Sequence, residues 1–340
     1  MRRNRTHVPA LGGIALLVLL SACGQPGSSG GGAPSSTASG EATTSTAAAC
    51  EPIADEKFVV LEDDKNLQTV DNVIPAIKAD AAQPPMVAAL DAVSAALDTA
   101  TLIDLNRQVD VERSTSSRAA AAFYEEAGIE VTDTSGSGDV VVGAANFSES
   151  ATLAELYALA LRDAGYSAQV RTIGNRETYE PALESGAVTV VPEYAGTLTE
   201  FLNKKVNGPD ATVDDPQASP DLDATVENLR TLGQEVGLSF GQPSEAANQN
   251  AYAVTAAFAD EHGVSTLTEL GEACAGLVLG GPPECPDRPF CLPGLEETYG
   301  IDIAEFVSLD AGGPLTKQAL TSGEIALGMV FSSDAALSAG

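Results

Sequence analysis

The sequence predicts an α/β protein with two lobes, each built on a mixed, mostly parallel sheet. From residue 139 on, apolar strand-like runs alternate with amphipathic helical segments, and a strand-helix-strand-helix-strand order implies a parallel sheet. A similar alternation recurs in residues 265–331, and the length of 340 residues suggests about two domains. In both blocks a helix ends at a glycine, Gly186 or Gly323, which tolerates a left-handed cap before an apolar strand.

The spacing of apolar residues places the individual elements. In the first block Leu153, Leu156 and Leu161 fall on one helical face. The strands expected there are 139–143, 168–173 and 187–191, and the helices are 151–164 and 177–184. The second block has a helix ending near residue 274, strands at 277–280, 306–308 and 325–331, and a helix at 314–321. Residues 53–130 have a strand at 58–61 and helices at 84–97, 102–109 and 118–127, and residues 132–138 are a linker by composition.

Composition and charge exclude several classes of partner. Lys and Arg number 17 and Asp and Glu number 48, so the formal net charge is −31. Nucleic-acid binding and electrostatic docking on anionic lipid both need clustered basic residues, so we expect neither. A hydrophobic content of 44% argues against a wholly disordered chain.

The N-terminus is typical of an export signal. Three arginines precede an apolar run from Ala10 to Leu20, which is too short for an ordinary membrane-spanning helix. The following Leu-Ser-Ala-Cys resembles the lipobox of bacterial lipoproteins, which implies a signal peptide over 1–22 and lipidation of Cys23. An ordinary signal peptide with a chance cysteine is the alternative. The Gly-, Ser-, Thr- and Ala-rich stretch that follows, up to residue 49, predicts a flexible linker, so 23–49 is expected to be lipid anchor and tether.

The remaining cysteines agree with export. An even number of cysteines remains after Cys23, namely Cys50, Cys274, Cys285 and Cys291. This favours two disulfides in an oxidising compartment. Four cysteines allow three pairings. Pairing Cys285 with Cys291 would close a short Pro-rich loop and leave Cys50 to pair with Cys274. A zinc site is the alternative, but there is no C-x-x-C pair, and His262 is the one histidine beyond the predicted signal.

Two sequence blocks carry a resemblance to a known family. Residues 140–150 read VVVGAANFSES, and residues 182–197 read ALESGAVTVVPEYAGT. These blocks resemble the substrate-binding proteins of ABC importers for glycine betaine, choline and related osmoprotectants, whose pattern includes G-S-K-N-F-T-E and P-E-Y-x-G-T. Later landmarks follow in the family order at 250–254, 294–300, 319–323 and 333–334. The resemblance implies a periplasmic-binding-protein-like fold with a hinge between the lobes.

The order of the blocks implies a circular permutation. The stretch FVVLEDDK at 58–65 and the helices after it lie C-terminal in the family but N-terminal to Asp139 here. Joining Gly340 to about Cys50 and opening the chain near Gly136 would restore the usual order, so Gly340 should lie near residues 50–57. Lobe 1 would then comprise 139–248 plus 66–130, and lobe 2 would comprise 249–340 plus 50–65. The alternative is that residues 53–130 form an unrelated helical module.

The resemblance also implies a ligand site at the strand ends. A quaternary ammonium group has no N–H donor, and it is held over aromatic faces. We expect aromatic, polar and acidic side chains of both lobes to contact the ligand. They are Asn146, Phe147, Ser148, Tyr179, Glu193, Tyr194, Thr197, Asn250, Tyr252, Phe331, Ser333 and Asp334. For each of these side chains core packing, helix capping or a solvated carboxylate is the competing interpretation; Ser148, for example, could simply cap a helix that has Glu149 in its first turn.

The chain departs from the family where a carboxylate would be anchored. Ala145 stands where the family often has lysine, and Thr255 stands where a basic residue is often found. This weakens the case for glycine betaine itself and leaves room for choline or an uncharged polar solute. Arg176 or Lys317 could substitute.

Enzyme motifs are lacking in the sequence. It has no nucleophile elbow, no P-loop and no dinucleotide glycine pattern, and one histidine offers a poor base for a triad. We expect no catalysis, no cofactor and no metal. The predicted function is that of a monomeric, lipid-anchored extracytoplasmic protein that binds a small solute and delivers it to an ABC permease. The alternatives are a ligand-sensing or adhesion lipoprotein with no transport partner, or a hydrolase on an α/β scaffold.

Overall fold

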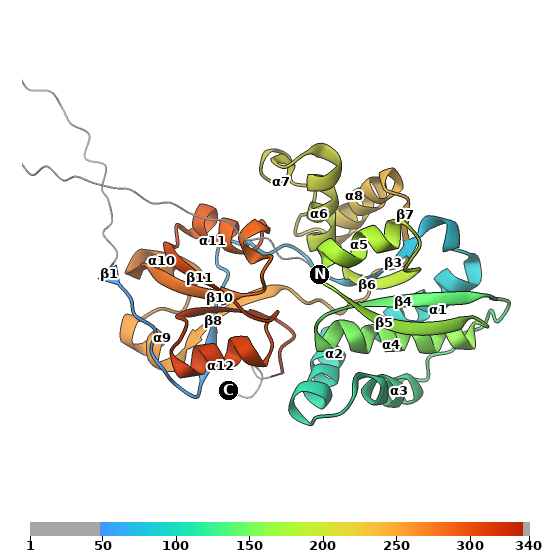
Figure 1. Cartoon of the computed structure of the whole chain (residues 1–340), viewed down its shortest axis with the longest axis horizontal. Helices are drawn as coiled ribbons and strands as arrows, with labels where there is room; N and C mark the ends of the chain where they lie inside the picture. The colour runs from blue at the N-terminus through green and yellow to red at the C-terminus, as the bar shows by residue number, and fades with distance from the viewer. Residues whose placement is uncertain (1–47, 336–340) are drawn as a thin grey trace, which may run out of the picture. The chain divides into compact units, whose positions relative to one another are not determined.

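The computed structural model describes residues 48–335, which form two five-stranded sheets and the helices around them (Figure 1). The first sheet has the strand order β5-β4-β6-β3-β7, and the second has the order β11-β10-β12-β8-β2. We refer to the elements around these sheets as the first and the second lobe. The predicted signal peptide, Cys23, most of the predicted linker and Gly340 lie outside the described residues.

The first sheet confirms the predicted parallel arrangement at its centre. Strand β4 is parallel to β5 and β6, whereas β3 runs antiparallel to both β6 and β7. Strand β6 lies three residues later than predicted, so that it ends at Tyr194. The strands are β3 (Val73–Lys78), β4 (Asp139–Ala145), β5 (Ser167–Gly174), β6 (Val190–Tyr194) and β7 (Leu238–Phe240).

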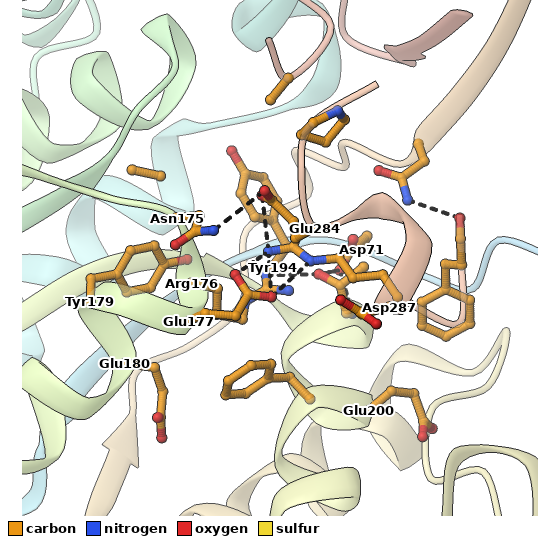
Figure 2. A pocket seen from close by; sticks show the side chains of 18 of the residues that line it. Asp71, Asn175, Arg176, Glu177, Tyr179, Glu180, Tyr194, Glu200, Glu284 and Asp287 are labelled. Carbon is orange, nitrogen blue, oxygen red and sulfur yellow. Dashed lines mark hydrogen bonds and ion pairs between the residues drawn. The ribbon is translucent and has the colours of Figure 1, made fainter. Parts of the chain in front are cut away.

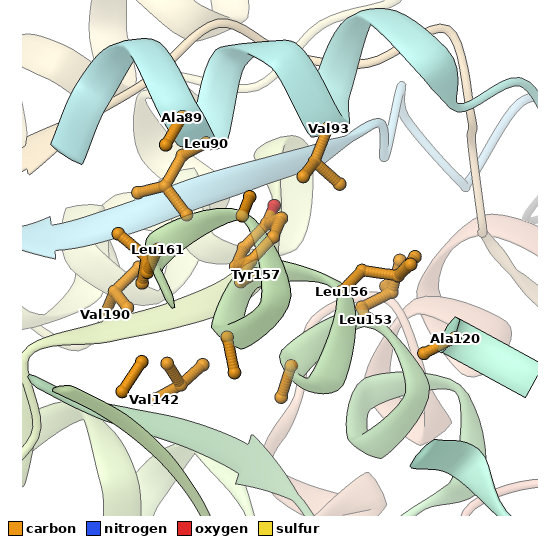
Figure 3. Packing of buried hydrophobic residues seen from close by; sticks show 14 of the residues in the cluster. Ala89, Leu90, Val93, Ala120, Val142, Leu153, Leu156, Tyr157, Leu161 and Val190 are labelled. Atoms are coloured by element: carbon orange, nitrogen blue, oxygen red, sulfur yellow. The ribbon is translucent and has the colours of Figure 1, made fainter. Parts of the chain in front are cut away.

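Helices cover both faces of the first sheet. Helices α1 to α4 pack on one face, where Leu90 and Val93 of α1 meet Tyr157 of α4 above Val142 and Val190 (Figure 3). Each such buried side chain contributes about 1.5–3 kcal/mol of apolar burial. Helices α5, α6 and α8 pack on the opposite face. The helices are α1 (Pro84–Ala96), α2 (Thr99–Asn106), α3 (Ser116–Glu126), α4 (Ser148–Asp163), α5 (Arg176–Glu184), α6 (Ala195–Asn207), α7 (Ala211–Asp214) and α8 (Leu222–Glu235).

The second lobe repeats this plan on a mixed sheet. Strand β10 is parallel to β11 and β12, and β8 is antiparallel to β12 and β2. Gly323 has a φ of 72°, and its counterpart Gly186 in the first lobe has a φ of 77°, which confirms the predicted left-handed caps. The strands are β2 (Phe58–Leu61), β8 (Asn250–Thr255), β10 (Leu277–Gly281), β11 (Ile303–Ser308) and β12 (Leu327–Phe331). The helices are α9 (Ala256–His262), α10 (Leu267–Ala273), α11 (Leu292–Tyr299) and α12 (Pro314–Ser322).

Two disulfides lie in the second lobe. Cys50 is bonded to Cys274, next to the short parallel pair β1 (Ala48–Ala49) and β9 (Cys274–Ala275). Cys285 is bonded to Cys291 across a tight loop that contains the 3₁₀ turn η3 (Cys285–Asp287). These are the pairs put forward from the sequence. His262 lies beside the first disulfide, with its Nδ1 3.5 Å from the Cys50 Sγ.

Within residues 48–335, two connections join the lobes, and we name them the crossing segments, residues 62–72 and 241–249. They run side by side, because Asn72 and Ala247 form an antiparallel bridge and the Gln249 side chain donates to the carbonyl of Thr69 at 2.6 Å. The end of β12 lies against them, since the Ser332 amide donates to the Gln249 carbonyl at 2.9 Å. Paired extended segments of this kind are where a hinge motion between two lobes can occur.

Within residues 48–335 no single helix is long and apolar enough to cross a membrane. Two successive helical segments, Pro84–Ala96 and Thr99–Val111, are long and apolar enough only when taken together, and they are bent by 88° relative to each other.

Candidate ligand-binding site

A cavity of about 450 Å³ is lined by residues of both lobes (Figure 2). The first lobe contributes residues that follow β4, the last residue of β6 and side chains of α5 and α6. The second lobe contributes the ends of β8 and β12 and the loop 282–290. The structure brings seven of the predicted site residues to this cavity. They are Asn146, Phe147, Tyr179, Tyr194, Thr197, Asn250 and Phe331.

Three aromatic side chains from strand ends form a continuous surface on the cavity. Phe147 follows β4, Tyr194 ends β6 and Phe331 ends β12. The ring centroids of Phe147 and Tyr194 lie 6.3 Å apart at an interplanar angle of 29°, and those of Phe147 and Phe331 lie 5.5 Å apart at 33°. Since Phe331 belongs to the second lobe, the surface spans both lobes. Phe201 and Phe290 add further aromatic lining that the sequence analysis did not name.

The Tyr194 hydroxyl is held by a buried carboxylate, Glu149. It donates to Glu149 Oε1 at 2.5 Å, and the Asn248 side chain donates to the same oxygen at 2.7 Å. Asn106 Nδ2 and Ser333 Oγ donate to Oε2, each at 2.6 Å. Burial raises the pKa of Glu149, and the four donors oppose this by stabilising the ionised form. The network fixes the Tyr194 ring and links it to the second lobe through Ser333.

The start of α4 differs from simple capping. Phe147 is the cap residue, and no side chain accepts a hydrogen bond there. Ser148 therefore does not cap the helix, and Glu149, 3% exposed, is not the solvated first-turn acid that the capping interpretation assumed. The amide of Ala145 instead donates to Ser150 Oγ at 2.9 Å.

Arg176 and Glu193 form a buried ion pair beside the cavity. Arg176 donates to both Glu193 oxygens at 2.9 and 2.7 Å, and the Tyr179 hydroxyl donates to Glu193 Oε1 at 2.7 Å. Burial disfavours the Arg176 cation, but the adjacent Glu193 carboxylate outweighs it and keeps the pKa of Arg176 above its usual value. Glu193 is thus neutralised by the protein, and Arg176 already holds a carboxylate.

Asp71 is a cavity residue that the sequence analysis missed. It lies in the first crossing segment, is 4% exposed and lines the cavity. Its Oδ1 accepts from the Thr197 amide at 3.0 Å and from Thr197 Oγ1 at 3.3 Å. Burial raises the pKa of Asp71 to about 7, although the Thr197 hydrogen bonds and the Arg176 charge oppose the shift.

Four predicted residues line a second cavity or lie behind the first. Ser148, Ser333 and Asp334 line an adjoining cavity of about 200 Å³, which shares Phe147 and Phe331 with the larger one. Asp334 lies 2.5 Å from the ammonium group of Lys317, so this lysine also holds a carboxylate. Tyr252 is 1% exposed and packs in the core of the second lobe.

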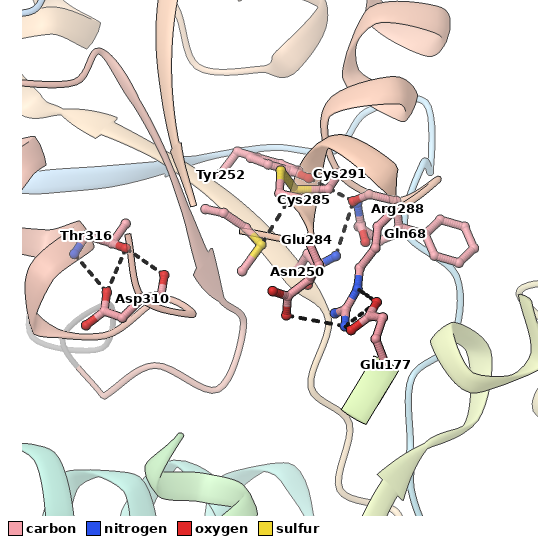
Figure 4. Close-up of a disulfide and its surroundings, with 12 residues drawn as sticks. Gln68, Glu177, Asn250, Tyr252, Glu284, Cys285, Arg288, Cys291, Asp310 and Thr316 are labelled. Atoms are coloured by element: carbon pink, nitrogen blue, oxygen red, sulfur yellow. Dashed lines mark hydrogen bonds and ion pairs between the residues drawn. A yellow bond between two sulfur atoms is a disulfide. The ribbon is translucent and has the colours of Figure 1, made fainter. Parts of the chain in front are cut away.

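The disulfide loop 285–291 forms part of the wall on the side of the second lobe (Figure 4). Its Arg288 lies 3.0 Å from Glu177 of the first lobe. The carbonyl of Phe290 accepts hydrogen bonds from Asn250 at 3.1 Å and from the Tyr252 hydroxyl at 2.7 Å. Tyr252 therefore supports the loop from behind, and Asn250 both supports it and lines the cavity.

Two α/β lobes around an aromatic-lined cavity define a two-lobed solute-binding protein. The family model described as the substrate binding domain of ABC-type glycine betaine transport system matches residues 37–126 and 138–339, and the chain belongs to this family. It is thus a substrate-binding protein of an ABC importer. Such proteins are extracytoplasmic, and the two disulfides agree with that compartment.

Several solved structures are similar to this chain at low identity. A crystal structure of a glycine betaine/carnitine/choline ABC transporter matches at 19% identity and a TM-score of 0.38, over 59% of this chain and 70% of the other. NikA from Brucella suis in complex with Fe(III)-EDTA matches at 14% identity and a TM-score of 0.29, over 58% and 48%. The unliganded open form of MppA, a periplasmic murein tripeptide binding protein, matches at 9% identity and a TM-score of 0.23, over 55% and 44%.

Proposed function

We propose that the protein binds a small quaternary ammonium osmoprotectant of the glycine betaine and choline class in the cavity between its lobes. The observation that carries this proposal is the surface formed by Phe147, Tyr194 and Phe331. A quaternary ammonium offers no N–H donor, and it is attracted by the electron-rich faces of aromatic rings. Each such contact contributes about 0.5–2 kcal/mol, more when the site is desolvated.

The cavity offers little to anchor a carboxylate, which supports choline over glycine betaine. Three of the four basic side chains that line it already hold an acidic partner, and the fourth, Lys204, is exposed to solvent. The three pairs are Arg176 with Glu193, Lys205 with Glu180, and Arg288 with Glu177. A carboxylate of the ligand would have to displace one of these partners or bind the exposed Lys204, whose ammonium group donates to the Asp287 carbonyl at 3.3 Å.

Ligand binding is proposed to close the lobes on the crossing segments, and the closed form then docks on the ABC permease. Contacts across the cavity support this, because Arg288 and Glu284 of the second lobe meet Glu177 and Asn175 of the first. We further propose that the protein acts as a monomer held at the membrane by a lipid on Cys23. Globomycin treatment or mass spectrometry of the mature N-terminus tests that anchor.

A circularly permuted order is proposed for the chain, with lobes at 66–130 plus 139–248 and at 50–65 plus 249–340. The family model matches in two segments, and the gap between them contains Gly136, where the usual order would begin. Residues 53–61 lie in the second lobe, since Thr255 Oγ1 donates to the Ile53 carbonyl at 2.7 Å and β2 pairs with β8. A side chain at Gly323 would meet the backbone of Ala54. A chain reopened near Gly136 with its old ends joined should fold and bind ligand.

A ligand screen by calorimetry tests the proposed function. Choline, glycine betaine, carnitine, proline betaine and ectoine are titrated into the wild type and into Tyr194→Ala. A ligand at a hundred times its dissociation constant should add about 2.7 kcal/mol to the free energy of unfolding. Tyr194→Ala should weaken binding, whereas the control Tyr124→Ala, on α3 with its hydroxyl on Asp163, should not. No binding of any quaternary amine would refute the assignment.

A further inference from the structure

Asp71 presents a carboxylate oxygen that the protein leaves available to a ligand. Both hydrogen bonds from Thr197 go to Oδ1. Among residues 48–335, no hydrogen bond or ion pair engages Oδ2. Asp71 is nonetheless 4% exposed, and Figure 2 shows it among the labelled residues of the pocket, close to Arg176. A buried carboxylate is costly unless a cation or several donors balance it.

The neighbouring charges do not balance Asp71. Arg176 of α5 is the cation nearest to this cluster, and its guanidinium is already held by Glu193 of β6 at 2.7 Å. Tyr179 adds a neutral hydroxyl that also points at Glu193. Glu200 of α6 lines the same cavity and accepts from backbone amides. Asp71, Glu193 and Arg176 together carry two negative charges and one positive charge when ionised.

The cavity lining as a whole carries a net negative charge. Six acidic and four basic side chains line the cavity, so a cationic ligand meets a net negative wall. Glu177, Glu180 and Glu284 each lie on a basic or amide partner. Glu200 accepts from amides through both oxygens, and Asp287 is exposed, so within residues 48–335 Asp71 is the buried lining carboxylate that has an oxygen without a partner.

We propose that Asp71 is the counter-ion for the ligand's cationic group, so that the cavity selects solutes of net charge +1 over zwitterions with the same head group. This inference rests on the proposed function, since it specifies the charge of the solute bound at that site. The proposal also implies that ligand binding is coupled to the release of a proton. A cation binds to the ionised carboxylate, and so a protonated Asp71 carboxyl must transfer its proton to the buffer when the ligand enters.

The coupling gives a pH profile with a defined direction. Burial raises the pKa of Asp71 to about 7, with the Thr197 hydrogen bonds and the Arg176 charge lowering it and the Glu193 charge raising it. Below that value, the apparent dissociation constant for choline should rise about tenfold for each pH unit, because only the ionised fraction binds the cation. The number of protons released on binding should approach one near pH 6.

The test compares choline with glycine betaine, a zwitterion with the same head group, and with 3,3-dimethyl-1-butanol, the uncharged analogue of choline, in wild type and Asp71→Asn. Asparagine keeps the oxygen that accepts from Thr197. The wild type should prefer choline at least tenfold at pH 8, and D71N should lose most of that preference together with the proton release measured in buffers of different ionisation enthalpy. Asp223→Asn, at an exposed carboxylate of α8 that does not line the cavity, is the matched control and should change neither.

The outcomes separate the two proposals. If the wild type binds no quaternary ammonium at any pH, the proposed function fails. If the wild type binds choline and D71N binds it equally well with the same pH profile, Asp71 is not the counter-ion, and the proposed function stands without it. Circular dichroism of D71N confirms that a loss of choline binding is not a loss of folding.

Discussion

Asp71→Asn should stabilise the ligand-free protein at neutral and basic pH. The pKa of Asp71 rises from its ordinary value of 3.8 to about 7 in the folded protein, chiefly through burial. Between these values the folded protein holds a proton that the unfolded chain has released. The contribution of Asp71 to stability therefore falls as the pH rises from about 4 to 7, and the loss is complete above pH 7.

The size of this loss follows from the shift. A difference of about 3 pKa units corresponds to about 4 kcal/mol at 1.36 kcal/mol per unit. Asparagine stays neutral at every pH and keeps the acceptor for Thr197, so the D71N variant avoids the loss. The free energy of unfolding of D71N minus that of the wild type should thus be about 4 kcal/mol larger at pH 8 than at pH 4.

Urea denaturation at intervals from pH 4 to pH 8 measures this difference. Using the difference between two variants removes the contribution of all other titrating groups. Asp223→Asn, at an exposed position of α8, serves as the control for the substitution itself. A D71N difference that does not change with pH, or a variant less stable than the wild type at pH 8, would refute the reasoning. Saturating choline should raise the free energy of unfolding of the wild type at pH 8 but should raise that of D71N only a little.

Three further predictions concern the surroundings of the cavity. Replacing Cys285 and Cys291 by serine should lower the free energy of unfolding by about 2 kcal/mol in urea denaturation, because the disulfide closes a loop of only seven residues. Glu149→Gln should lower the free energy of unfolding by about 3 kcal/mol in the same assay, because an amide nitrogen would then face two of the four donors that contact Glu149. An unchanged free energy of unfolding would contradict this hydrogen-bond network. Arg288→Ala should change the free energy of unfolding by less than about 1 kcal/mol, because its ion pair with Glu177 is partly exposed. The same substitution should speed ligand release about fivefold in stopped-flow experiments. An unchanged release rate would count against closure of the lobes over the ligand.

Most of the fold was predictable because it rests on local patterns. The apolar spacing around Leu156 places α4, and the glycines after α5 and α12 mark their ends. Strand β3 was missed because Pro75 stands in its middle, and proline is a poor predictor of a central strand. In the structure Pro75 lies opposite Pro192 of β6. The segment is a strand because it pairs with β6 and β7, and the local residue pattern does not reveal that pairing.

The candidate site was predictable only where it is built from strand ends. Phe147, Tyr194 and Phe331 follow apolar runs, so their place at a sheet edge can be inferred locally. Asp71 and Phe290 lie in a crossing segment and a disulfide loop, and folding alone brings them to the cavity. The −31 net charge also hid Asp71, because one acidic residue among 48 carries no signal until its burial is known.

The most direct test of the central claim is a crystal structure of the protein with choline. We expect a quaternary nitrogen within about 6 Å of the ring centroids of Tyr194 and Phe147, with the Asp71 carboxylate on the same side of the cavity. Choline bound elsewhere, or lying in the cavity with its cation turned away from these rings, would contradict it.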